Sequence, residues 1–291
     1  MPGRAVALLL VAVSGVAFDE AQIFWAPSWE EARKEATTRR VPILVAFLKD
    51  GEARSVDVWD TTFQDPLMVA YLNEVAVPLP AHTAAADKGH SPESIVDPRT
   101  GKTTDRCSVY KVITCPDHNS IHSEALTFLR VTETPRCFVL GPEGKPLSGT
   151  GEVKGTRPQD LLQALKAAQR SLGKPLSRTI YRRARDKLAQ GRAHFEAEEF
   201  APAIRALQGL AKDRKAPDVF RKESEQLLSE VNAAGIDRVV KAQSVLRENP
   251  KEGRRLLREM RATFRGLEAA EVAKRALVEA GKPHQGKGGR K

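Results

Sequence analysis

Apolar and polar residues follow two different periods along the chain. In the first half, short apolar runs typical of buried strands, at residues 41–48, 75–79 and 137–140, alternate with segments of helical spacing. Strands that alternate with helices are typical of α/β layering. Residues 178–281 show helical periodicity only. The pattern therefore predicts an α/β domain over residues 22–174, followed by an all-helical domain.

Capping residues and prolines locate the helices expected in the first half. Ser28 can cap a helix that ends at Arg40, and Asp65–Pro66 can begin another. A short helix is expected over residues 123–130, and an amphipathic helix over Asp160–Leu172 closes the domain. We therefore expect helices to flank the sheet.

A polar stretch interrupts this domain at about residues 81–120. It is rich in Pro, Thr, Asp and His, and it contains two of the three cysteines. Polar segments of this length between periodic elements are typical of long loops. We therefore expect a loop-like insertion, in which His82 and His90 are loop residues.

The helical half divides into six expected helices. Apolar residues recur at helical spacing over residues 180–195, and a second helix begins near Pro202, which suits a first turn. Two separate helices are expected over residues 219–231 and 236–246, and a fifth begins after a cap at Asn249. A sixth helix completes the domain.

The two ends of the chain differ in composition from a packed domain. Residues 1–17 combine Arg4 with an apolar run and small residues before an acidic pair, which is typical of a cleaved secretory signal. The run is short for a membrane span. The Gly- and Lys-rich tail, residues 282–291, is expected to be disordered. We therefore expect an exported protein, periplasmic, extracellular or in the cell envelope, where disulfides persist.

Charge is shared unequally between the two halves. Residues 1–174 contain 20 Lys and Arg against 21 Asp and Glu, whereas residues 175–291 contain 27 against 16. A basic helical surface can meet nucleic acid, anionic lipid or an acidic protein. Here the two signs are interspersed, and aromatic residues that could stack on bases are scarce. We expect a solvated surface, at most weak association with anionic surfaces, and no nucleic-acid partner.

Several motifs of the first half occur in a familiar order. Residues 25–32 contain the pattern W-x-x-S-W-x-x-A, a strand follows at residues 42–47, and residues 131–135 contain V-x-x-T-P before another strand and the turn at residues 141–145. This order resembles the thioredoxin-like superfamily, in particular its exported members. The resemblance implies a central mixed sheet flanked by helices. It also implies a cis peptide bond before Pro135, at the border of the family's active site.

The cysteine pair that gives this family its chemistry is missing. When the family's motif is aligned by counting back from Phe63 without a gap, the two positions of the Cys-x-x-Cys motif fall on Glu52 and Ser55. Thiol–disulfide exchange needs an attacking thiolate and a resolving thiol. A carboxylate and a hydroxyl provide neither, so we expect the usual site to be redox-inactive. Thr134 and Pro135 remain, and in the family that edge contacts extended peptide; alternatively, Pro135 serves the fold alone.

Three cysteines remain elsewhere and allow three hypotheses. Cys107 and Cys115 could form a structural disulfide within the insertion. They could instead bind zinc or copper together with His118 and His122, which would share one face of a helix. In the third hypothesis, Cys137, close to Pro135 in sequence, performs relocated redox chemistry with one of the other two, which requires sulfurs within disulfide reach.

The helical half loosely resembles tetratricopeptide helix hairpins. Gly191, Ala203 and Leu207 fall at the glycine, alanine and large apolar spacings of that repeat. The resemblance implies a small stack of antiparallel helices with a protein-binding groove. The alternative is an irregular helical bundle.

Together these patterns favour a non-catalytic protein. We expect an exported thioredoxin-like module that binds or scaffolds a protein or peptide partner, with no catalytic residue and no cofactor. The alternative is a thiol–disulfide or metal-dependent protein that uses the relocated cysteines and nearby histidines.

Overall fold

The chain forms two compact units that divide between Pro175 and Leu176. The computed structural model describes residues 22–83, 92–96, 103–111, 113–147 and 151–281. The expected signal segment, residues 1–17, and the tail, residues 282–291, lie outside these ranges. In the part of the chain that is described, no helix is long and apolar enough to cross a membrane.

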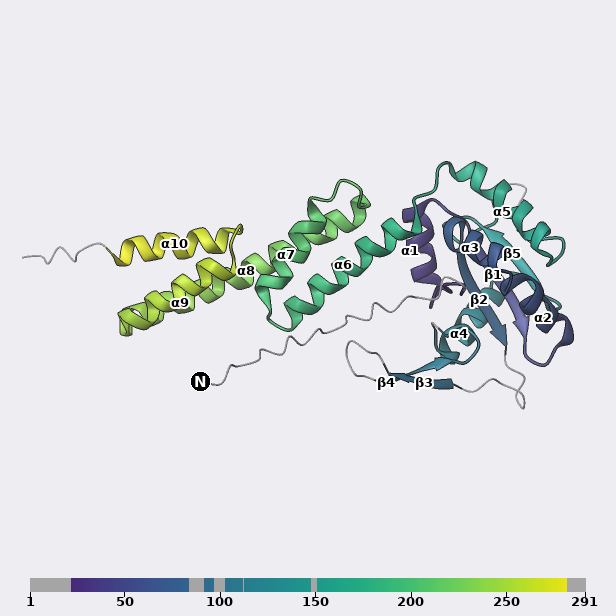
Figure 1. Ribbon diagram of the computed structural model, residues 1–291, viewed down its shortest axis with the longest axis horizontal. Helices are drawn as coiled ribbons and strands as arrows, with labels where there is room; N and C mark the ends of the chain where they lie inside the picture. The colour runs from purple at the N-terminus through teal and green to yellow at the C-terminus, as the bar shows by residue number, and fades with distance from the viewer. Residues whose placement is uncertain (1–21, 84–91, 97–102, 112, 148–150, 282–291) are drawn as a thin grey trace, which may run out of the picture. The chain divides into compact units, whose positions relative to one another are not determined.

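A three-stranded mixed sheet forms the centre of the first unit (Figure 1). Strand β1 (Ile43–Lys49) lies between β2 (Val77–Thr83), which runs parallel to it, and β5 (Arg136–Leu140), which runs antiparallel. The predicted α/β class is therefore correct for this unit. In the described residues of this unit, six helical segments accompany the sheet: α1 (Trp29–Arg39), α2 (Ala53–Val58), the π-helix η1 (Trp59–Phe63), α3 (Pro66–Val75), α4 (Cys115–Leu126) and α5 (Pro158–Leu172).

The central strand explains why the first unit has two cores. Successive side chains of a strand point to opposite faces of the sheet. The even-numbered residues from Leu44 to Leu48 join a cluster with apolar residues of α3 and α5. The odd-numbered residues from Ile43 to Phe47 join a second cluster with residues of α1 and α4. Helices therefore cover both faces, which accounts for the uninterrupted apolar run of β1.

Two of the predicted helix starts are confirmed by their caps. The Ser28 hydroxyl accepts a hydrogen bond from the Glu31 amide at 3.1 Å, and α1 begins at the next residue. The Asp65 carboxylate accepts from the Met68 amide at 2.7 Å, with Pro66 in the first turn of α3. These interactions involve residues three apart, so the sequence alone reveals them.

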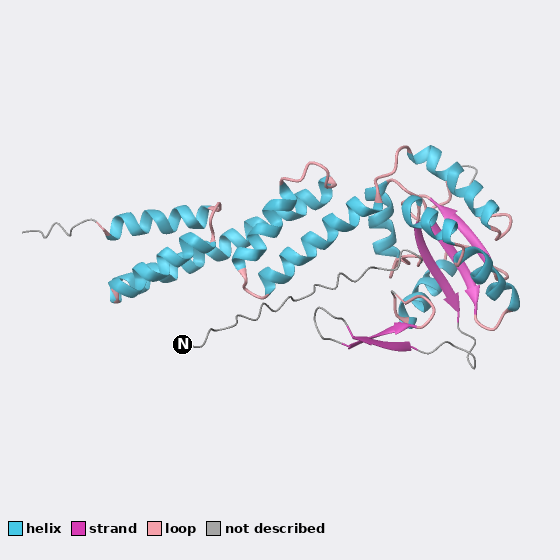
Figure 2. Ribbon diagram, viewed as in Figure 1, coloured by secondary structure: helices cyan, strands magenta, loops and turns pink. Residues whose placement is uncertain are grey.

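The prediction of a loop at about residues 81–120 is wrong in several places. A two-stranded ribbon, β3 (Pro92–Val96) with β4 (Thr103–Cys107), lies within it, drawn in magenta apart from the main sheet in Figure 2. Helix α4 begins at Cys115, eight residues earlier than the helix expected from residue 123. Every residue of β3 is exposed, so the ribbon lacks the apolar alternation that marks a half-buried strand.

Five helices form the described part of the second unit, up to residue 281, and consecutive ones pack together. The separate helices expected over residues 219–231 and 236–246 are one helix, α8. Gly235 lies inside this helix. The position suits glycine, because a Cβ there would approach the Phe264 ring to 2.7 Å. The long helix α8 contacts all the other helices of the unit. These are α6 (Arg178–Glu196), α7 (Phe200–Ala211), α8 (Asp218–Glu248), α9 (Pro250–Thr263) and α10 (Glu268–Ala280).

Candidate functional site

A hydrogen-bonded cluster occupies the position where the resemblance places the redox cysteines. Glu52 immediately precedes α2, and Ser55 lies in the first turn of that helix. The Glu52 carboxylate oxygen Oε2 accepts a hydrogen bond from the Ser55 hydroxyl at 2.5 Å. It accepts a second from the Thr134 hydroxyl at 2.7 Å, across 82 residues of chain. The Lys49 amide at the end of β1 donates to Ser55 Oγ at 3.1 Å, which ties the cluster to the sheet.

The four residues predicted for this edge therefore lie together. Thr134 contacts Glu52 directly, and the peptide bond between Thr134 and Pro135 is cis. Pro135 is buried, and β5 begins at the next residue. What the sequence did not reveal is the bond from Thr134 to Glu52, because it depends on how β1 and β5 pair.

Glu52 is an ionised acceptor at neutral pH. Burial is the largest single influence on its pKa and would raise it. The hydrogen bonds from Ser55 and Thr134, with the charges of Arg54 and Lys49, act in the opposite direction and together hold the pKa below its usual value. The cluster is thus an anionic group held by two hydroxyls, and it contains no sulfur.

A cleft lies beside this cluster and includes Pro135 in its wall. Its volume is about 370 Å³, within the range of pockets that hold small ligands or a few side chains. The charged side chains in the wall are of both signs, and Arg136 is already paired with Glu152 at 2.9 Å. The lining residues come from α2, the start of β5 with the proline before it, and the segment after β5: Ala53, Arg54, Asp57, Val58, Pro135, Arg136, Val153, Gly155 and Thr156.

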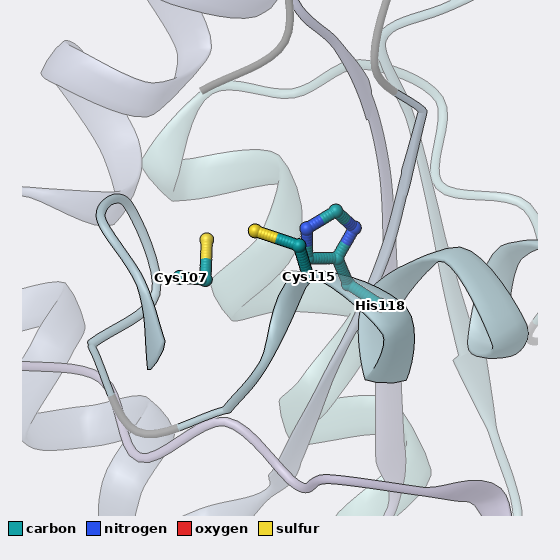
Figure 3. A group of neighbouring side chains, drawn as sticks. All are labelled: Cys107, Cys115 and His118. Atoms are coloured by element: carbon teal, nitrogen blue, oxygen red, sulfur yellow. The ribbon is translucent and has the colours of Figure 1, made fainter. Parts of the chain in front are cut away.

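Three of the four residues predicted as metal ligands lie together in the first unit. One ligand atom each from Cys107, Cys115 and His118 lies within 4.8 Å of the other two (Figure 3). The fourth, His122, is not part of this group: its Nδ1 lies 3.2 Å from the carbonyl oxygen of Ala81. Cys137 lies on β5, opposite Ala46 of the central strand.

All three cysteines of the described chain carry thiols rather than disulfides. Burial raises the pKa of Cys107 to about 11, although hydrogen bonds from the backbone at Tyr110 and Val109 act against it. Burial also raises the pKa of Cys137 to about 12. Both are neutral thiols at pH 7, whereas disulfide exchange requires a thiolate.

A buried polar network that the sequence did not suggest adjoins the cysteines. His82 was expected in a loop, but it lies on β2 and is 5% exposed. Its Nε2 lies 2.7 Å from Asp50 Oδ1, and its Nδ1 lies 2.7 Å from the Tyr110 hydroxyl. The His118 ring packs 5.4 Å from the rings of both His82 and Tyr110. His90 lies outside the described residues.

These observations define a mixed α/β unit with a carboxylate–hydroxyl cluster beside a cis-proline, followed by an all-helical unit. No family model matches the chain, and no curated protein matches it. Among solved structures it is similar to one described as "DsbH Oxidoreductase". The two are 16% identical, with a TM-score of 0.35, over 52% of this chain and 86% of that chain.

Proposed function

We propose that this chain is an exported, non-catalytic, thioredoxin-like module that binds an extended segment of a protein partner. The observation that carries the proposal is the Glu52 carboxylate, held by Ser55 and Thr134 at the edge next to Pro135. Members of the thioredoxin-like superfamily, which the sequence resembles, contact extended peptide at this edge. The cleft beside Pro135 provides room for side chains of such a segment.

The chemistry of the first unit favours binding over thiol catalysis. A carboxylate and a hydroxyl at Glu52 and Ser55 cannot exchange disulfides. The pKa values of Cys107 and Cys137, about 11 and about 12, disfavour the thiolate form elsewhere. Exposed charged residues at the cleft, Arg54 and Asp57, can pair with groups of either sign on a partner.

The helical unit fits a scaffolding role in this proposal. Its basic surface, with 27 Lys and Arg against 16 Asp and Glu over residues 175–291, offers a second interaction surface. In the tetratricopeptide-like alternative, Gly191 permits the close approach of α6 and α7, because a Cβ there would lie 2.5 Å from Leu207.

Filling the cleft tests the binding site. Peptides that bind the wild-type chain are first selected from a displayed random library. We expect Ala53→Trp to bind these peptides at least about tenfold more weakly than the wild type does, a loss of roughly 1.4 kcal/mol. Ala53 is an exposed helical residue in the cleft wall. The matched control is Ala167→Trp, an exposed helical alanine in a separate cavity on α5, and it is expected to bind as the wild type does.

Two results would contradict the proposal. One is equal peptide affinity in Ala53→Trp and the wild type. The other is insulin reduction by the chain that clearly exceeds the rate with dithiothreitol alone, because that turnover requires a reactive thiol pair.

A further inference from the structure

We propose that Cys107, Cys115 and His118 form a binding site for one thiophilic metal ion, with Zn²⁺ as the preferred occupant. Ligand atoms of the three side chains lie within 4.8 Å of one another, and Figure 3 shows the Cys115 sulfur turned toward Cys107. Two sulfurs and one imidazole are donors that zinc and copper(I) select over harder cations. This site shares no residue with the Glu52 cluster or its cleft, so it stands independently of the proposed function.

Local structure brings the three donors together. Cys115 is the first residue of α4, and His118 lies one helical turn later on the same face. The helix start is fixed by a capping box, in which the Thr114 amide donates to Asp117 at 2.7 Å and the Asp117 amide donates to the Thr114 hydroxyl at 3.3 Å. This cap therefore fixes both α4 donors relative to the preceding chain.

The third donor reaches the start of α4 through a tight return of the chain. Cys107 ends β4, its amide donates to the Ile113 carbonyl at 2.8 Å, and its carbonyl accepts from the Lys111 amide at 2.9 Å. These bonds hold the backbone of Cys107 close to Lys111 and to Ile113, the residue two before Cys115. The sulfur of Cys107 is thereby placed beside that of Cys115.

Surrounding groups orient two of the three donors. His118 Nδ1 lies 3.4 Å from the carbonyl oxygen of His82, so an Nδ1–H there donates to it and the lone pair stays on Nε2. Figure 3 shows a ring nitrogen of His118 turned toward the sulfurs. The Tyr110 amide donates to Cys107 Sγ at 3.4 Å. Hydrogen bonds of this kind, outside the ligands themselves, are typical of protein metal sites.

The charge and exposure of the site favour zinc. Zn²⁺ with two thiolates and a neutral imidazole carries no net charge, which suits the full burial of Cys107 and the 1% exposure of His118. Copper(I) would leave one net negative charge. Cys115 is half-buried, so water can enter beside it and complete a tetrahedral zinc site. When the metal binds, two sulfur–metal bonds form and the two thiol protons pass to solvent.

Metal titration of the full chain tests the site. Reduced, metal-free protein is titrated with Zn²⁺ under anaerobic conditions, in competition with a chromophoric chelator. A parallel titration uses Cu⁺, and a third uses Co²⁺ as a spectroscopic probe. We expect one Zn²⁺ per chain and sulfur-to-cobalt charge-transfer absorption. Cys115→Ser and His118→Asn are expected to lose at least about 100-fold in Zn²⁺ affinity, since each removes a ligand.

Matched controls come from the same chain. Cys137→Ala removes a cysteine outside the group, and His122→Asn removes the other histidine of α4, so both are expected to bind Zn²⁺ as the wild type does. Ala53→Trp should also bind normally, which separates this site from the proposed peptide cleft. Circular dichroism of Cys115→Ser, whose side chain is half-buried, verifies that the fold is intact.

Three results would overturn the proposal. The first is the absence of stoichiometric Zn²⁺ uptake by the reduced wild type. The second is equal affinity in Cys115→Ser and the wild type. The third is a Cys107–Cys115 disulfide found by mass spectrometry, together with no metal uptake after its reduction. Stoichiometric uptake of Cu⁺ by protein that takes up no Zn²⁺ would overturn the choice of zinc and reassign the site to copper.

Discussion

At the scale of single residues, the Glu52 carboxylate shows how one charged side chain can connect two elements that lie far apart in sequence. Its carboxylate joins the first turn of α2 to Thr134 through two short hydrogen bonds. Hydrogen bonds to a charged group contribute more to stability than those between neutral groups. The position of Glu52 followed from counting along the sequence, but its partner Thr134 did not, because 82 residues separate them.

Glu52→Gln is expected to destabilise the first unit by about 1 kcal/mol at neutral pH, because a neutral amide accepts weaker hydrogen bonds. The pKa of Glu52 is lowered in the folded state. Its extra stabilisation is therefore present above the unfolded-state pKa and is lost as the pH falls through the folded-state pKa. The difference between the variant and the wild type should accordingly shrink in the acid range, below about pH 4.

Urea unfolding followed by tryptophan fluorescence measures this effect. All three tryptophans, Trp25, Trp29 and Trp59, lie in the first unit, so the signal reports on that unit alone. Glu143→Gln, at an exposed position of the same unit, serves as the control and should stay within about 0.5 kcal/mol of the wild type. A deficit in Glu52→Gln that persists unchanged at low pH would contradict the assigned role.

At the scale of elements, close approaches between helices decide how the second unit packs. Gly253 of α9 lies so close to α8 that a Cβ would meet the Leu246 Cα at an impossible separation. Gly209 of α7 is exposed, and a Cβ there would meet nothing within 4 Å. Both are helical glycines, so they differ in their surroundings rather than in their conformation.

Gly253→Ala is expected to destabilise the second unit by about 1–3 kcal/mol, because the added methyl group forces α8 and α9 apart. Gly209→Ala is expected to stabilise it by about 0.5–1 kcal/mol, because alanine has the higher helix propensity. Differential scanning calorimetry of both variants beside the wild type measures the shifts. Shifts of the same sign would show that propensity, rather than the close approach, governs these sites.

Sequence patterns located most elements but misjudged where some of them end. The start of α4 was missed because its first turn, from Cys115 to His118, is polar, although Thr114 with Asp117 is a capping signal that could have revealed it. The division of α8 was wrong because Gly235, a residue that often ends helices, lies inside α8, and no proline follows it within the helix. Phe264 and Ala269 lie so close to that position that a Cβ would meet them at 2.7 Å and 2.8 Å, so glycine is the residue that fits there.

At the scale of the whole molecule, the chain contains two units with separate hydrophobic cores. The core of the second unit consists of two clusters built from α6 to α10 and the adjoining loops. Among the residues that the structure describes, none of the first unit belongs to either cluster. A unit with its own core is able to fold alone.

A fragment of residues 176–281 is therefore expected to be helical and to unfold cooperatively. Far-UV circular dichroism and urea titration of the fragment, compared with the full chain, measure this. The predicted domain boundary between residues 174 and 178 stays a prediction that this experiment tests. Gradual loss of helical signal without a cooperative transition would show that the second unit needs the first.

The sequence by itself determined the features that depend on near neighbours. The apolar run of β1, the caps at Ser28 and Asp65 and the helical spacing beyond residue 178 all involve residues close together in the chain. Local geometry and burial on one face are sufficient to specify them. That Glu52 and Ser55 stand where the resemblance places two cysteines also follows from residue identities alone, and it stays a prediction.

Only the tertiary structure decided which distant side chains meet. It joined Glu52 to Thr134, buried His82 between Asp50 and Tyr110, and selected His118 rather than His122 as the neighbour of the two cysteines. These contacts depend on strand pairing and on the path of the polar segment before α4. No short sequence pattern specifies that path, because the contacts that stabilise it join residues far apart in sequence and form only when the chain packs against the sheet.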